Sequence, residues 1–525
     1  MSQVKKPDVT VNKLRASLST GNADQKLLVI GQKMAAGTAI EKTLYTNITR
    51  EDIDDKFVLE SALGVTLSAI FDEFEQAPSP NLPRVDVIPL EDASGTPAKA
   101  TVSFSGTADK VGTIDFNIMG KELSLSVAVD DDPSDDTAAA FKTAVDLLEL
   151  PLTVTDNEDG TVDLEANNDG TIFNSATIKI DGLAKDGSDY VLGSLVVGLT
   201  GFTGGATNPT LTNLLDVVSK IRYQTMTYPY EYGTDLATDF LDARFNVSND
   251  IKDGVCILKA TDAKADLVSI LEALNSQSLV ILCNKEVSED LFDGGEDLEL
   301  DFVAAARVAA IRALRLTEDA SIDNFTPASV SGDLDSKGGM HIASLPYANT
   351  PVYGSPIQPE GRGWTDTEAA ELFTAGGSIM GNNKAGNSVI LDKIRTTYKT
   401  DAAGNVDLTW RYLNTVDTLS VCAEYLFNNL KIAYVQSRLT PGNIVRGYSM
   451  VNDKAFILKM LKLFELLGDK ALVPKSKAAS KFFVDNMVVV IDTVEGSITS
   501  SNELPIVVQL REILVNLKTN FGSNL

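Results

Sequence analysis

Residues that commonly carry catalysis are scarce in this sequence of 525 residues. His341 is the only histidine, which excludes a histidine pair, a histidine-rich metal site and the HExxH zinc motif. It follows Gly338–Met340 in a loop-rich stretch, a context more typical of a surface side chain than of a general base. The cysteines lack the spacing of a disulfide or a zinc site; they are Cys256, Cys283 and Cys422. The sequence therefore predicts no catalytic residue and no cofactor.

Two acidic segments and one glycine-rich segment contain residue types that occur in ligand sites. Aligning the glycine of Thr155–Gly160 with the invariant EF-hand glycine places Thr155 and Ala166 at positions that need carboxylates. This segment predicts a hairpin turn instead. The aspartate-rich run 130–136 predicts a solvated turn that leads into a helix. No lysine follows the glycines of 201–205, so they indicate a junction between domains, and no metal or phosphate site is predicted.

The first part of the chain contains the patterns of an apolar strand, a helical segment and a proline-rich linker. Alternating hydrophobic residues after this linker predict a β-rich region. The strand is expected at 26–31, the helical spacing at 57–74 and the linker at 78–89. Period-two alternation with glycine turns then predicts an antiparallel meander interrupted by one helix. The expected strands are 101–105, 113–118, 123–129, 152–155, 161–165 and 176–180, and the helix is 136–148.

From residue 211 onward, helical and strand patterns alternate, which is typical of an α/β arrangement. Residues 278–283 are apolar on both faces, as in a central strand covered by helices. The predicted helices are 211–220, 234–245, 263–275, 302–316, 413–432 and 450–467. The predicted strands are 223–229, 254–260, 278–284, 482–492 and 504–517.

The most specific segment is 386–420. A strand pattern from Val389 to Tyr398 precedes an Asp/Gly turn and then Trp410–Thr415, with a helix expected from about Leu413. This order resembles the C-terminal domain of contractile-tail sheath proteins, the Mu-like phage branch in particular, in which a strand ending in TTY leads into an RYLNT segment. Three further segments follow the family's order: the strand and turn at 26–39, the GGATNP junction at 204–209 and the alanine-rich helix from 301.

The resemblance implies a structural subunit and not an enzyme. Such a subunit polymerises as stacked six-fold rings around a tail tube and contracts to drive the tube through the host envelope. The implied partners are further copies of the chain, the tail tube protein, and the baseplate and tail terminator proteins. The implied location is the virion, after assembly in the host cytoplasm.

The implied fold is a multidomain α+β or α/β chain. It has a sheath core with a mixed β-sheet flanked by helices, an inserted antiparallel β-rich domain, and extended N- and C-terminal arms. The boundaries expected are 1–25 for the N-terminal arm, 26–85 and 204–385 for the two parts of the core, 86–203 for the inserted outer domain, 386–503 for the C-terminal sheath domain and 504–525 for the C-terminal arm.

The two ends of the chain are the candidate assembly sites. Segment 504–517 is long and apolar, so it is expected either to be buried in its own domain or to pair with a neighbouring chain. The first 50 residues contain 8 basic and 3 acidic residues, a balance of +5, which indicates an arm that lies against an acidic neighbour. In the family, arms from adjacent subunits add strands to a third subunit's sheet. The residues expected to make these contacts are Val9, Val11, Leu14, Ile506, Val508, Leu510, Ile513, Val515 and Leu517.

Composition excludes several other classes. The net charge of −28 argues against a nucleic-acid partner. No apolar run approaches the ~20 residues of a membrane span, and the N-terminus lacks the apolar region of a signal peptide, so no membrane partner is expected. Residues 86–205 contain 22 acidic and 6 basic residues, a balance of −16, which predicts a strongly acidic insertion.

Some alternatives stay open at this point. A phage-derived contractile bacteriocin (tailocin) would use the same kind of subunit as an infectious phage. A nucleotide-handling α/β enzyme is disfavoured because Gly31–Gly37 does not fit a phosphate-binding loop. A surface adhesin with a carbohydrate-binding β-domain is disfavoured by the missing secretion signal. The chain also departs from the family, because Glu424 is the only charged residue in 421–429, where members usually carry an arginine-rich helix.

Overall fold

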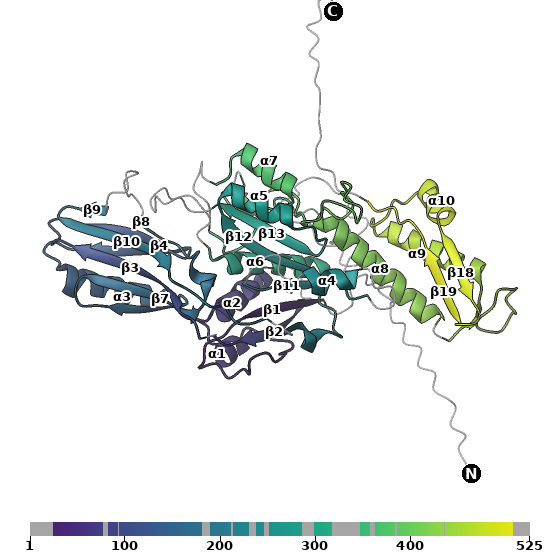
Figure 1. Ribbon diagram of the computed structural model, residues 1–525, viewed down its shortest axis with the longest axis horizontal. Helices are drawn as coiled ribbons and strands as arrows, with labels where there is room; N and C mark the ends of the chain where they lie inside the picture. The colour runs from purple at the N-terminus through teal and green to yellow at the C-terminus, as the bar shows by residue number, and fades with distance from the viewer. Residues whose placement is uncertain are drawn as a thin grey trace, which may run out of the picture.

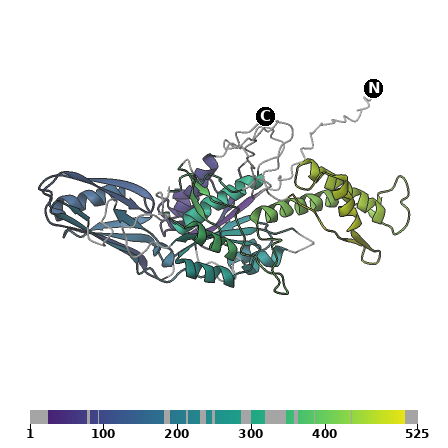
Figure 2. The same cartoon turned by 90° about the horizontal axis from the view of Figure 1, so that it is seen from above.

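The computed structural model describes residues 25–76, 82–92, 94–180, 190–211, 214–229, 238–245, 251–285, 299–317, 347–356, 363–383, 386–434 and 436–507. Figure 1 shows an elongated molecule in which a β-rich lobe, a central α/β body and a mainly helical lobe follow one another. The view from above in Figure 2 shows the same order. The chain is therefore a mixed α/β protein with several sheets, as expected from the sequence.

The central body is built on a parallel five-stranded sheet of order β13-β12-β11-β1-β2. Its strands are β1 (Lys26–Gln32), β2 (Arg84–Leu90), β11 (Thr225–Thr227), β12 (Val255–Asp262) and β13 (Leu279–Lys285). A mixed sheet was expected here, but every pairing between these strands is parallel. Parallel strands need crossover connections, and these place helices on both faces.

Successive residues of these strands bury their side chains on opposite faces, as the pleat requires. Leu27 and Val29 of β1 join the cluster beneath α2 (Ala62–Glu75) and α6 (Asp301–Thr317). Leu28 and Ile30 join the cluster on the other face. The helices of that face are α4 (Thr238–Phe245), α5 (Lys264–Ala273) and α7 (Asp366–Ala375), while the short α1 (Asp52–Phe57) lies with α2.

The β-rich lobe contains two antiparallel sheets. The first has the order β6-β7-β3-β10-β9 and the second β5-β4-β8. Phe141 of α3 (Ala138–Asp146) contacts Phe104 of the first sheet and Phe116 of the second, so the helix joins the two cores. The strands are β3 (Pro97–Ser105), β4 (Gly112–Ile118), β5 (Lys121–Val127), β6 (Leu152–Asp156), β7 (Thr161–Asp169), β8 (Ile178–Ile180), β9 (Tyr190–Leu192) and β10 (Leu195–Thr203).

The mainly helical C-terminal lobe comprises the outer part of α8, residues 426–434, and residues 436–507. Its apolar cluster centres on Phe464 and Phe483, whose rings stack 4.5 Å apart. Figures 1 and 2 show α8 running from the central body out to this lobe. The elements are α8 (Leu413–Tyr434), β16 (Arg438–Leu439), β17 (Met450–Val451), α9 (Asp453–Asp469), α10 (Lys477–Asp485), β18 (Val488–Asp492) and β19 (Ser497–Ser501).

Several sequence predictions are wrong in detail. Residues 214–218 form only a 3-10 turn where a helix over 211–220 was predicted. The run 482–492 is half helix, because Ser476 caps α10 and Phe483 packs on α9, and only its end forms β18. Strand β2 crosses the boundary expected at residue 86, so the core sheet continues to Leu90.

The strand predicted over 389–398 is also largely irregular. Its start forms β15 (Ser388–Ile390), which pairs with β14 (Met380–Asn382). Thr397 instead donates its backbone N–H to Leu279 at the edge of the central sheet. The segment therefore passes along the edge of the central sheet without forming one continuous strand, although its apolar residues alternate. The helix expected near Leu413 begins at that residue.

Candidate assembly interface

Most of the predicted contact residues lie outside the described part of the chain. These are Val9, Val11, Leu14, Val508, Leu510, Ile513, Val515 and Leu517. Ile506 is described and is half-buried. Beside it, Leu504 packs on the apolar cluster of the C-terminal lobe and Val507 donates its N–H to Leu472 O at 3.0 Å. The described end of the chain therefore runs along this lobe.

The hairpin β18–β19 is the clearest candidate site. Its two strands pair from Val488↔Ser501 to Asp492↔Ser497. Val489 and Ile498 face the lobe's apolar cluster, whereas Val488 is 62% exposed and Val490 58% exposed on the other face. Within the residues the structure describes, no third strand pairs with either one. Each outer edge consequently offers main-chain groups to an added strand.

The hairpin turn is fixed locally by its own side chains. Asp492 Oδ1 accepts hydrogen bonds from the backbone N–H groups of Val494 and Glu495, at 2.8 and 3.0 Å. Gly496 supplies a φ of +68°, which favours glycine. The sequence signal for this hairpin is the turn Asp492–Gly496 followed by alternation in β19, and a single strand over 482–492 does not account for it.

Exposed apolar side chains gather on the same lobe. Of the 21 large hydrophobic residues that are exposed in the described part of the chain, ten lie in the C-terminal lobe. Apolar surface concentrated in one region of a protein marks an interaction site more often than scattered single residues do. The ten are Ile432, Ile444, Val445, Tyr448, Leu458, Phe482, Val488, Val490, Val494 and Val507.

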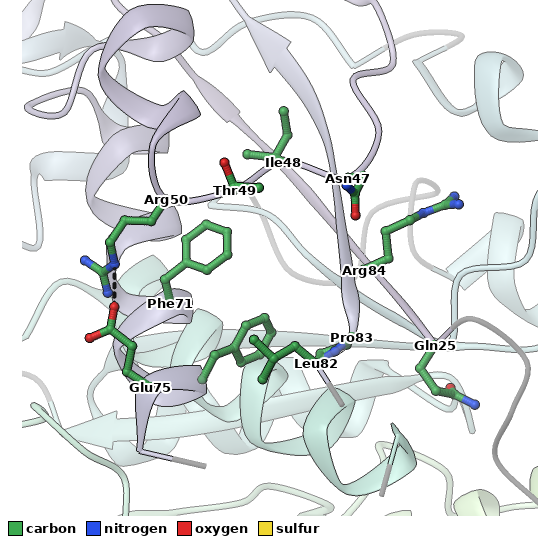
Figure 3. Close-up of a pocket in the computed structure, with 11 residues that line it drawn as sticks. Gln25, Asn47, Ile48, Thr49, Arg50, Phe71, Glu75, Leu82, Pro83 and Arg84 are labelled. Carbon is green, nitrogen blue, oxygen red and sulfur yellow. Dashed lines mark ion pairs between the residues drawn. The ribbon is translucent and has the colours of Figure 1, made fainter. Parts of the chain in front are cut away.

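A hollow of about 510 Å³ lies at the start of β1 and β2 in the central body. Figure 3 shows the ion pair of Arg50 and Glu75 on one side of it and Arg84 on the other. Arg50 also pairs with Asp72 at 2.6 Å, and Arg84 pairs with the buried Asp86 at 2.7 Å. Both arginines are thus paired with this chain's own carboxylates, so neither is set aside for an anionic ligand.

The central body also contains a buried charged cluster between α2 and α6. Glu73 is only 2% exposed and lies near Arg307, which binds Glu299 at 2.7 Å. Burial raises the pKa of Glu73 to about 8, and Arg307 partly offsets that rise. The cluster joins two packed helices, α2 and α6.

The cysteines are buried, and burial raises the pKa of each thiol. Such thiols are inert. Among the described residues, no group of three or more His, Cys, Asp or Glu side chains is placed to hold a metal ion. None of the helices that the structure describes has the length and apolarity to cross a membrane.

No family model matches this chain, and no curated protein does. Solved structures similar to it include a sheath tail protein from Desulfitobacterium hafniense, at 9% identity and a TM-score of 0.43, covering 97% of this chain and 99% of that one. A sheath tail protein from Listeria innocua is 12% identical, with a TM-score of 0.41 and 91% coverage of both chains. The contracted helical sheath of the anti-feeding prophage is 11% identical, with a TM-score of 0.47, covering 99% of this chain and 100% of that one.

Proposed function

We propose that this chain is the structural subunit of a contractile tail sheath of the Mu-like branch. Copies polymerise as stacked six-fold rings around a tail tube, and contraction drives the tube through the host envelope. The observation that carries the proposal is the two-stranded hairpin β18–β19, which has an exposed apolar face and no third strand among the described residues. The RYLNT segment at the start of α8 supports the same assignment.

Strand addition is the proposed link between subunits. The N-terminal arm, through Val9, Val11 and Leu14, pairs with one edge of a neighbour's hairpin. The C-terminal arm of another neighbour, through Ile506 and the alternating residues up to Leu517, pairs with the other edge. Each added strand satisfies the exposed main-chain groups and covers the outward valines. Such ladders act as hinged links that persist while weaker contacts between subunits rearrange.

Contraction then needs no catalytic group in this chain. An extended lattice assembled around the tube is converted to one with more buried contact, and the free-energy difference moves the tube. The particle is a virion, or a tailocin of the same construction, assembled in the host cytoplasm. Its further partners are the tail tube, baseplate and tail terminator proteins.

The acidic β-rich lobe is proposed to face outward. It lies at the opposite end of the molecule from the C-terminal lobe (Figure 1), and the segment 86–205 has the charge balance of −16 given above. A radial subunit with its C-terminal lobe near the tube would carry this charge to the outer surface. Like charge there would keep finished particles from bundling.

The hairpin is tested by Val490→Lys, with Val406→Lys as the matched control. Val406 is 82% exposed in a loop of the central body, so both changes add the same charge at the surface. Each should change folding stability by less than about 0.5 kcal/mol. In sedimentation velocity over a concentration series, wild type and Val406→Lys should form large assemblies, while Val490→Lys should stay small. Equal assembly of all three proteins would refute the hairpin as the linking site.

A further inference from the structure

Helix α8 is the mechanical connection between the central body and the C-terminal lobe. Its first half is buried against the body, and it then continues outward to the lobe (Figures 1 and 2). Asp417, Ser420 and Glu424 follow one another at intervals of three and four residues, so they form one polar stripe along the helix. A polar stripe on the buried part of a helix needs partners, because unpaired buried charge is costly.

Arg312 of α6 holds the first position of the stripe. Asp417 is fully buried and accepts hydrogen bonds from Arg312 Nε at 3.1 Å and Nη2 at 2.7 Å. Its second oxygen accepts from Tyr347 Oη at 2.7 Å. The same guanidinium donates to Gln224 O and Thr225 Oγ1, so it links α8 to the start of β11.

Arg222 holds the other two positions. Its guanidinium pairs with Glu424 Oε2 at 2.8 Å and donates to Ser420 Oγ at 2.8 Å. It also pairs with Asp253 Oδ1 at 2.9 Å and donates to the carbonyl oxygen of Asp253 at 3.2 Å. Arg222 precedes β11 and Asp253 precedes β12, so a single side chain fixes α8 to two adjacent strands of the central sheet.

Such pairs specify geometry more than they add stability. A buried ion pair often contributes little net free energy compared with an apolar replacement, but its hydrogen bonds require one relative position of its partners. Apolar contact across this joint is less directional: Leu316, at the end of α6, packs in the same cluster as Val421, Cys422 and Tyr425 of α8. The polar stripe is therefore the part of the joint that selects the rotation and the tilt of the helix.

The length of α8 makes this selection important. A helix of 22 residues is about 33 Å long, so a tilt of about 10° at its base moves its far end by about 6 Å. Neighbouring strands in a sheet lie only about 4.8 Å apart. An error of that size at the joint would displace the hairpin β18–β19 by more than one strand position.

We propose that Arg222 and Arg312 are positioning residues for assembly: they lock α8 to the central body so that each hairpin meets its neighbours' arms in register. The assembly role rests on the proposed sheath function, whereas the fixed orientation of the lobe is a property of the single chain. The two parts can therefore be tested separately.

The orientation is measured by pulsed electron paramagnetic resonance on the full chain, kept dilute so that it stays monomeric. Spin labels are attached through Val406→Cys in the central body and Val494→Cys at the hairpin turn, because these side chains are 82% and 90% exposed. The native thiols of Cys256, Cys283 and Cys422 are buried, so the labelling reagent does not reach them in the folded chain. Counting bound labels verifies this.

Glu424→Gln and Arg222→Gln each remove one charge of the Arg222–Glu424 pair, and Arg222→Lys keeps the charge without the planar fork. Asp485→Asn is the control, because it removes a carboxylate from an exposed pair with Lys481 on the same lobe. Wild type and the control should give one narrow distance distribution. The two glutamine variants should give a broadened or shifted one, and Arg222→Lys an intermediate one. Glu424→Gln carries the test if Arg222→Gln does not fold, as judged by circular dichroism.

Narrow, unshifted distances in Glu424→Gln and Arg222→Gln would overturn the role of Arg222. Arg312→Gln, measured in the same way, tests Arg312, and unshifted distances there as well would overturn the proposal, since apolar packing alone would then fix the lobe. Sedimentation of the same variants, without labels, tests the assembly role. A loose joint with normal assembly would also overturn it. A wild-type chain that never assembles, even with its tail tube protein present, would instead refute the sheath function, and broadened distances in the variants would still support the fixed joint.

Discussion

Replacing Glu73 with glutamine should make the central body less sensitive to alkaline pH. Glu73 faces α6 from α2, and the backbone N–H of Tyr353 donates to its carboxyl group. Burial raises its pKa from an ordinary 4.5 to about 8, with Glu299 adding to the rise and Arg307 opposing it. In the unfolded chain the same carboxyl ionises near 4.5.

The sign of the effect follows from proton binding. Between pH 4.5 and about 8 the folded state retains a proton that the unfolded state releases, so the free energy of unfolding falls as pH rises through this window. At about 1.36 kcal/mol for each pH step, the whole window corresponds to a loss of at most about 5 kcal/mol. Glutamine has nearly the same shape, stays neutral and can still accept from Tyr353, so Glu73→Gln avoids this loss.

The assay is urea unfolding of wild type and Glu73→Gln from about pH 5 to about pH 9. The variant should differ least at the acidic end and should be the more stable protein at the alkaline end. Glu75→Gln is the matched control, because Glu75 is the last residue of α2 and its carboxylate is exposed. Its difference from wild type should change little with pH. A difference between Glu73→Gln and wild type that does not grow with pH would refute the account of this buried carboxyl.

Three further predictions concern the joint, the arm and the insertion. Asp417→Asn should destabilise the protein by about 3–5 kcal/mol in thermal melts, because it leaves Arg312 buried without its counter-charge. Removing residues 1–20 should abolish polymerisation while leaving the circular dichroism spectrum folded; a lost spectrum would contradict the arm assignment. Replacing residues 92–204 by a short linker should leave assembly intact. The variant also carries Phe302→Ser, because removing Phe173 exposes the Phe302 ring. Loss of assembly in this variant would show that the insertion is part of the lattice.

Local sequence patterns predicted much of the fold because the strands and helices concerned carry their own periodicity. Strand β13 is apolar on both faces, and α6 carries a run of alanine and branched apolar residues, so burial alone identifies them. The run 482–492 was misread because an apolar segment of that length suits a strand, whereas the cap at Ser476 makes its first part helical. The second part of the run forms the hairpin strand β18, and the turn that ends this strand can be predicted only if β19 is also recognised as a strand.

The long-range charge pairs could not be predicted in this way. Arg312 and Asp417 are 105 positions apart, and Arg222 and Ser420 are 198 apart. The residues around one partner do not indicate which residue it pairs with, because only the packing of α8 on the central sheet brings the two together. The same holds for the buried carboxyl of Glu73, which reads as one more acidic residue near the end of a helix.

The central claim, assembly into a sheath, is tested most directly by negative-stain electron microscopy of the purified full chain. The protein would be imaged over a concentration series, alone and with its tail tube protein. A sheath subunit should form tubes or stacked rings with six-fold symmetry. Particles that stay dispersed at every concentration, and with the tube present, would contradict it.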